Sequence, residues 1–217
     1  PNELVANKAF DVIDERSAAY IDRCPFMVIS TSNGGNSMDA SPRGGPPGFL
    51  QRLDDRHIAI PDLNGNNRLD TVEKMVSQPF VGVRRVMPGK DETVRINGPA
   101  TVTTDAAILD GFTVELRRPK AAIVVEVAEL YSHCAKSFRR GKVWQPESWA
   151  DLAETPDLAD IVGTQFDMEI DGWRADDGTR PPLAVRSQAK NLGLIARCCI
   201  GLDYTPEVSL ACTEAEA

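Results

Sequence analysis

The sequence predicts a mainly β protein, a small closed β-barrel with flanking helices. Three observations favour this class. Six or more short runs are apolar or alternate between apolar and polar residues, turn residues separate these runs, and a single clear helical pattern interrupts them. A closed barrel also leaves no open sheet edge, which suits a chain with so many short strands.

The first predicted element is an amphipathic helix over Leu4 to Asp22. Phe10, Ile13 and Ser17 recur at three- and four-residue spacings, and charged residues occupy the other side. The helix should end before Pro25, because the residue preceding a proline is pushed out of the helical region.

The predicted strands that follow are short and are bounded by turn residues. They are Phe26 to Ser32, Ser37 to Pro42, Phe49 to Leu53, His57 to Ile60, Phe80 to Met87, Thr93 to Thr103 and Lys120 to Leu130. One clear helix, Arg68 to Ser77, lies among them, with Asn67 as its expected N-cap and Pro79 just past its end. A shorter helical turn is expected over Asp105 to Gly111.

The charge distribution divides the chain of 217 residues near Trp144. Residues 1–144 hold 19 basic and 18 acidic residues, whereas residues 145–217 hold 5 basic and 14 acidic residues. We therefore expect a barrel domain over residues 1–145 and an acidic accessory region over residues 146–217, packed on the barrel or on a partner chain. Trp149 to Phe166 and Leu183 to Ile200 are its expected helices.

Composition argues against several classes of protein. No window approaches the roughly 18 to 20 apolar residues of a membrane span, and the charged start is not a signal sequence, so we expect a soluble cytoplasmic protein. The five cysteines lack paired spacing, which favours reduced thiols over disulfides or a zinc site. A net charge of −8 without a basic stripe makes nucleic acid an unexpected partner.

The most informative motif runs from His57 to Val76 and has the order strand, glycine-containing loop, helix. Amide donors at a helix start, the positive end of the helix dipole and a neighbouring guanidinium together form a site for a phosphate dianion. Asn67 and Arg68 lie where such a site would be.

The same residues offer two alternatives, a surface loop and a calcium site. Acidic and amide residues occupy positions 1, 3, 5, 9 and 12 of an EF-hand loop: Asp62, Asn64, Asn66, Asp70 and Glu73. However, the sixth position is Asn67 rather than glycine, and a strand ending in Pro61, rather than a helix, leads into the loop. We therefore predict no metal.

Two further stretches could contact a ligand. Asp39 to Phe49 is rich in glycine and proline, which permits close backbone approach to a flat ligand, and Arg43 could reach an anionic group or the edge of a ring system. Taken alone, such a loop is more often a tight turn. Tyr131 to Trp144 places four basic residues beside aromatic ones, although a solvated basic turn explains this equally well. His133 and Cys134 have no further ligand at metal spacing. The chain also has no nucleophile elbow, Walker loop or dinucleotide-binding glycine motif, as expected where a cofactor supplies the chemistry.

Taken in order, four segments resemble the FMN-binding split-barrel flavoproteins related to pyridoxamine 5'-phosphate oxidase. The segments are DASPRGGPPGF from Asp39, IAIPDLNGNNRLDTVEKM from Ile58, ETVRINGPATV from Glu92 and YSHCAKSFRRGKVW from Tyr131. The likeness covers roughly residues 20–145. It implies a mainly β fold, a six-stranded antiparallel split barrel, in a homodimer with FMN in two clefts at the interface.

The resemblance also implies which residues bind the cofactor. The strand Ala40, Ser41, Pro42, Arg43 would lie along the ring and ribityl chain, Asn66, Asn67 and Arg68 would hold the phosphate, Ile60 and Pro61 would close one side, and Arg95 and Lys136 would approach from the partner. No catalytic residue is implied. Because the first phosphate strand reads Ser-Pro-Arg-Gly and the oxidase's C-terminal substrate motif is missing, a general FMN-dependent oxidoreductase acting on a small molecule is expected rather than an oxidase of vitamin B6 phosphates. The alternative is a non-catalytic protein that binds or senses flavin, or binds haem.

Overall fold

The computed structural model describes residues 3, 8–63, 69–112, 117–151 and 153–166. The described residues divide into two compact units, one within residues 1–144 and one within residues 145–166. In the second unit the described elements are a short 3-10 helix, Pro146–Ser148, and helix α6, Leu158–Phe166. The helix expected over Leu183 to Ile200 lies outside the described residues.

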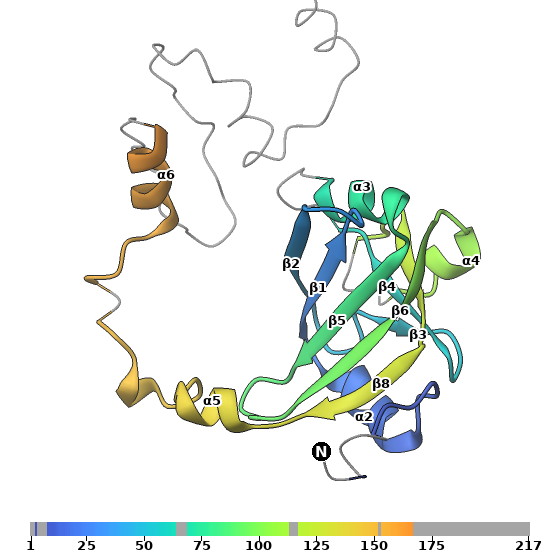
Figure 1. Ribbon diagram of the computed structural model, residues 1–217, viewed down its shortest axis with the longest axis horizontal. Coiled ribbons are helices and arrows are strands. Elements are labelled where there is room, and N and C mark those ends of the chain that lie inside the picture. The colour runs from blue at the N-terminus through green and yellow to red at the C-terminus, as the bar shows by residue number, and fades with distance from the viewer. Residues whose placement is uncertain (1–2, 4–7, 64–68, 113–116, 152, 167–217) are drawn as a thin grey trace, which may run out of the picture. The chain divides into compact units, whose positions relative to one another are not determined.

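The first unit is built mainly from antiparallel strands (Figure 1). Its strands are β1 (Phe26–Ser32), β2 (Met38–Gly44), β3 (Gln51–Arg52), β4 (His57–Pro61), β5 (Phe80–Val86), β6 (Thr93–Thr103), β7 (Ala122–Glu126) and β8 (Glu129–His133). Its helices are α2 (Glu15–Arg23), α3 (Asp70–Ser77), α4 (Ala106–Leu109) and α5 (Lys136–Arg140). The predicted class, a mainly β fold with flanking helices, is confirmed.

The strand order is β2-β1-β5-β6-β7-β4-β3, with β8 also paired to β6. Among the described residues the sheet thus has eight strands rather than six, and its hydrogen-bonded path runs from β2 to β3. The extra strand arises because the run Lys120 to Leu130 is two strands, β7 and β8, which pair with successive parts of the long β6.

Gly98 lies on β6 between these two pairings. A Cβ atom built there would come within 1.7 Å of the carbonyl oxygen of Glu126, so a larger residue would force the backbones apart. The chain leaves β7 through Val127 and Ala128, and the amide of Ala128 donates to the carbonyl of Asn97 at 3.0 Å. The close approach at Gly98 therefore sets the point where the sheet divides.

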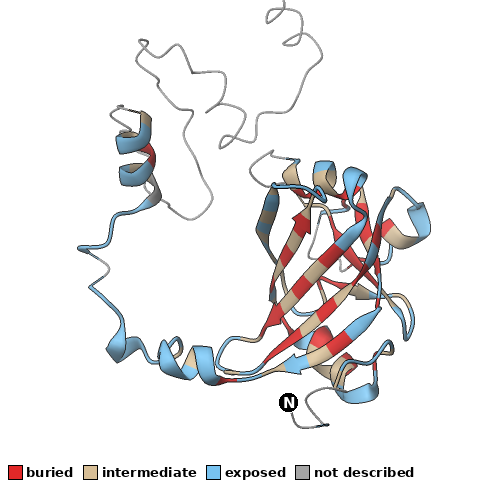
Figure 2. Ribbon diagram, viewed as in Figure 1, coloured by how far each residue is buried: buried red, intermediate tan, exposed pale blue. Residues whose placement is uncertain are grey.

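Alternation along the strands builds the core (Figure 2). On β1, Met27 and Ile29 are fully buried, and on β5 the inward positions are Val81, Val83 and Arg85. Helix α2 contributes Ile21 to the same core. Arg85 has no exposed surface, although arginine is seldom fully buried.

The helix boundaries differ from the predicted ones for local reasons. Helix α2 begins at Glu15 rather than near Leu4, because the side chain of Asp14 accepts from the amides of Arg16 and Ser17 at 2.8 and 3.0 Å and caps the helix there. Before it, Phe10 forms a β-bridge with Leu130. No described helix has both the length and the apolar character needed to cross a bilayer.

Candidate functional site

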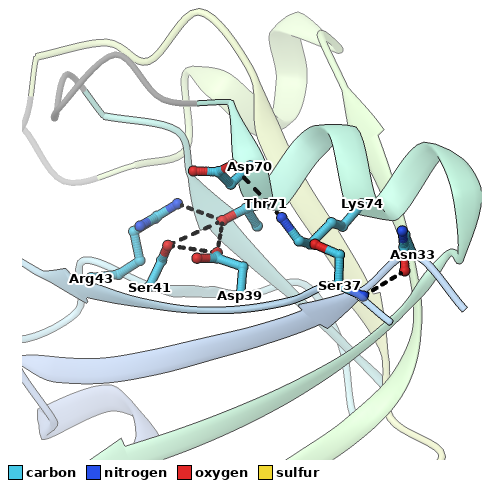
Figure 3. Close-up of polar contacts among 8 residues, drawn as sticks. All are labelled: Asn33, Ser37, Asp39, Ser41, Arg43, Asp70, Thr71 and Lys74. Atoms are coloured by element: carbon cyan, nitrogen blue, oxygen red, sulfur yellow. Dashed lines mark hydrogen bonds and ion pairs between the residues drawn. The ribbon is translucent and has the colours of Figure 1, made fainter. Parts of the chain in front are cut away.

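The two faces of β2 differ in polarity. Asp39, Ser41 and Arg43 point to one face and are half-buried, whereas Ala40 and Pro42 point to the other face and are exposed. In Figure 3 the three polar side chains rise from β2 toward the start of helix α3. Successive side chains from Ala40 to Arg43 therefore point to opposite faces of β2.

Thr71 of α3 is the centre of a hydrogen-bond network with this polar face. Its side-chain hydroxyl donates to Asp39 Oδ2 at 3.0 Å and accepts from Arg43 Nη2 at 3.2 Å. Ser41 Oγ donates to the same carboxylate oxygen at 2.7 Å and lies 3.4 Å from the Thr71 hydroxyl. Since Thr71 is only 3% exposed, this network fixes the guanidinium of Arg43 against the first turn of α3.

The N-terminus of α3 presents backbone donors beside Arg43. Leu69 is the N-cap residue and makes no side-chain capping bond. Asp70 and Glu73 lie in the first turn, and Asp70 forms an ion pair with Lys74 at 3.7 Å. Asn67, the predicted cap, lies outside the described residues, and the helix starts two residues later than expected.

This corner fits the phosphate of a nucleotide. A phosphate needs several N–H donors and a positive charge, and the helix start and Arg43 provide both. Asp39, the carboxylate on this face of β2, accepts from the hydroxyl groups of Ser41 and Thr71. The hydrogen bond that Arg43 makes on this face goes to Thr71 and not to Asp39, so its guanidinium can donate further hydrogen bonds to a ligand. Asn66, Asn67 and Arg68, the predicted phosphate ligands, lie outside the described residues.

The remaining predicted site residues lie elsewhere in the unit. Ile60 and Pro61 are buried on β4, where Ile60 belongs to the main core. Arg95 lies on β6 and donates from Nη1 to the hydroxyl of Tyr131 at 2.9 Å. Lys136 begins α5, which lies at the opposite end of the barrel from α3 (Figure 1). One chain therefore does not bring Arg43 and Lys136 together.

Sequence reasoning did not assign roles to Asp39 or Thr71. Asp39 opened one of the stretches that stood out, and its spacing of two residues from Ser41 and four from Arg43 was a usable signal, since such residues share one face of a strand. Thr71 gave no such signal, because its role depends on how α3 packs against β2.

The family comparison gives one result. The family described as pyridoxamine 5'-phosphate oxidase matches residues 13–134, more than half of the chain. The chain belongs to this family. Comparison with curated proteins gives no match.

Several solved structures are similar to this family member. The HupZ protein of Group A Streptococcus has 15% identity and a TM-score of 0.42, with 55% of this chain and 93% of that chain covered. A pyridoxamine 5'-phosphate oxidase-related, FMN binding protein from Nostoc punctiforme has 10% identity and a TM-score of 0.36, with 54% and 76% covered. An FAD-binding protein from Mesorhizobium loti has 11% identity and a TM-score of 0.38, with 56% and 94% covered. Identities this low do not carry a function from one protein to another.

Proposed function

We propose that this family member is a homodimeric FMN-dependent oxidoreductase that exchanges hydride with a small organic substrate. One observation carries the proposal: the guanidinium of Arg43 is held by Thr71 beside the start of α3. A cation beside a helix N-terminus suits a phosphate monoester such as the terminal group of FMN. The family to which the chain belongs supports the same choice.

The described residues would anchor the cofactor rather than perform the chemistry. FMN, when bound, supplies hydride transfer through its own ring system. Arg43 would donate charge-assisted hydrogen bonds to the phosphate, and Thr71 and Asp39 would hold that guanidinium in place. Asn67 and Arg68 would add donors from the segment before α3, and the backbone of β2 would lie beside the ribityl chain.

Exposed apolar side chains support the proposed homodimer. Met38, Phe26 and Phe80 are 75%, 38% and 45% exposed, and the strand register places all three on the outer face of β2, β1 and β5. A second copy covering this face would bury them. The partner's chain would then supply the groups equivalent to Arg95 and Lys136, because Lys136 belongs to α5, which lies at the opposite end of the barrel from α3 (Figure 1).

Cofactor binding tests this proposal directly. The purified chain should bind FMN with a shift in the flavin absorption spectrum and a higher melting temperature, and sedimentation should show a dimer. Consumption of NADPH or NADH in air would then separate a working reductase from a passive flavin carrier. The proposal would be refuted if the purified protein is colourless and micromolar FMN does not change its melting temperature.

Single substitutions test the phosphate corner. Arg43→Gln and Arg68→Ala should each weaken FMN binding by roughly 1.5 to 3 kcal/mol, the range of a hydrogen bond to a charged group. The matched control is Arg52→Gln, since Arg52 on β3 pairs with Asp22 at 3.9 Å and should leave FMN affinity unchanged. Riboflavin, which lacks the phosphate, should bind both variants and the native protein alike. Equal FMN affinity in the native protein and the three variants would show that the phosphate does not bind beside Arg43.

A further inference from the structure

The outer face of the sheet carries a second group of cations, away from the start of α3. Arg84 on β5 lies directly opposite Arg95 on β6, and Arg95 lies directly opposite Tyr131 on β8. His133 is two residues beyond Tyr131 and therefore points to the same face. Opposed Cβ atoms of neighbouring strands are only about 5 Å apart, so these side chains converge.

Lys8 joins this group from the chain that precedes α2. Its ammonium lies 5.0 Å from the centre of the Tyr131 ring and donates to the carbonyl of Ser132 at 3.2 Å. The guanidinium of Arg95 lies 5.6 Å from the centre of the same ring. We refer to Lys8, Arg84, Arg95 and His133 as the outer cation cluster.

The outer cation cluster has no acidic partner. In residues 8–63, 69–112, 117–151 and 153–166, no carboxylate comes within ion-pair distance of Lys8, Arg84 or Arg95. The one acidic side chain of β8, Glu129, accepts from Asn97 Nδ2 at 2.7 Å. Among the described side chains, Arg84 donates only to the Thr93 hydroxyl, at 3.5 Å. The positive charge is therefore uncompensated within the described structure.

The pKa values of two members of the outer cation cluster are lowered, by burial and by the neighbouring positive charges. Burial lowers the pKa of His133 below its ordinary value of 6.5, and Arg84, Arg95 and Lys8 lower it further. Burial and the nearby Arg95 likewise lower the pKa of Arg84. In addition, His133 Nδ1 is buried and has no hydrogen-bond partner among the described residues. Such an unsatisfied atom needs an explanation in a folded protein.

A bound anion would compensate the positive charge of the outer cation cluster and give His133 Nδ1 a hydrogen-bond partner. Like charges placed directly opposite one another destabilise a sheet, and an anion between them reverses the sign of the interaction. Guanidinium groups donate in a fixed planar geometry that matches carboxylate and phosphate. We propose that the outer cation cluster binds a small anion bearing a carboxylate or phosphate group. One chain supplies all four groups, and because Arg84 lies on the same outer face as Phe26, the proposal rests on the proposed homodimer leaving this cluster open to small anions.

Nuclear magnetic resonance of the histidine side chains tests the proposal on the full chain without FMN. The sequence has two histidines, so His133 and His57 can be followed separately. Inorganic phosphate, and separately succinate, should be titrated at constant ionic strength to exclude general screening. The His133 ring signals should shift saturably, as the anion favours the protonated ring, while those of His57, which pairs with Asp54 at 2.9 Å, should not.

Variants then locate the anion. Arg84→Gln and Arg95→Gln should each weaken the His133 response at least about tenfold, the scale of one charge-assisted hydrogen bond. Arg52→Gln is the matched surface control. Arg43→Gln separates phosphate at the α3 corner from phosphate here, and it should leave the His133 titration unchanged. Thermal melts of each variant show that it is folded.

Three outcomes would overturn the proposal. The His133 signals could fail to saturate with either anion, or the Arg84→Gln protein could respond like the native protein. Alternatively, the double variant Arg84→Gln, Arg95→Gln could sediment as a monomer where the native protein sediments as a dimer, and the His133 signals of the native protein could show no response to either anion. The cluster would then pair with carboxylates of a second copy, not with a small molecule.

Discussion

Arg84 and Arg85 are neighbours on β5 but lie in opposite environments. Arg85 points into the barrel and has no exposed surface, and its Nη2 donates to the carbonyls of Ile21, at 2.7 Å, and Cys24 at the end of α2. Arg84 points outward into the outer cation cluster and makes only one long hydrogen bond. Arginine thus has two different effects on the two faces of β5. Arg85 caps the end of helix α2 on the inner face, and Arg84 adds unbalanced positive charge on the outer face.

The comparison teaches that the surroundings of an arginine decide its contribution to stability. Inside, backbone carbonyls and the ring of Phe49, 5.1 Å from the guanidinium, partly compensate the loss of water, which nevertheless lowers the pKa of Arg85. Arg43 is intermediate, since it is half-buried and donates to the hydroxyl of Thr71 and to the carbonyl of Pro42. These three environments predict three different responses to substitution.

The largest effect is expected at Arg85. Arg85→Ala should lower the free energy of unfolding by about 3 kcal/mol or more, because it leaves a cavity in the core and removes the donor to the carbonyl of Cys24. Urea denaturation measures this change. The matched control, Arg84→Ala, should change the free energy by about 0.5 kcal/mol or less. Equal losses in the two variants would contradict the contrast between the faces of β5.

An intermediate effect is expected at Thr71. Thr71→Val keeps the shape of the side chain but removes the hydroxyl between Arg43 and Asp39, so the free energy of unfolding should fall by about 1 to 2 kcal/mol. Thr71→Ser, which keeps the hydroxyl, should retain most of the stability and the FMN affinity of the native protein. If valine and serine behave alike in urea denaturation, the hydroxyl does not hold Arg43.

The smallest effect is expected at Arg84, and it has the opposite sign. Arg84→Gln should raise the free energy of unfolding by a few tenths of a kcal/mol at low salt, because it relieves repulsion with Arg95. The gain should vanish in high salt, where the repulsion is already screened. Urea denaturation at two sodium chloride concentrations measures both quantities. A loss of stability at low salt would show that Arg84 has a compensating partner.

Much of the fold follows from alternation that is visible in the sequence. The runs Phe26 to Ser32 and Thr93 to Thr103 match β1 and β6 residue for residue, because each strand has one buried face. The division of Lys120 to Leu130 into β7 and β8 was not predictable from that run, since its cause is Gly98 on another strand. The start of α2 was also missed, because apolar spacing continues past the cap formed by Asp14.

The candidate site could be predicted only in part, for a related reason. Glycine, proline and charge marked the stretch that contains Ser41 and Arg43, and the structure brings both to the start of α3. Thr71 contacts them across 28 or more positions of sequence, so nothing local identifies it. The outer cation cluster depends on the register of β5, β6 and β8, which sequence spacing does not specify.

The sheet's end at β2 has a consequence for the protein in solution. An unpaired edge is a template on which another chain can add a strand and start aggregation. Pro42 lies in the middle of β2 and has no amide hydrogen, so an incoming strand would lack a donor at that position. By leaving the outer edge of β2 without one backbone donor, Pro42 thereby makes uncontrolled self-association through this strand less favourable.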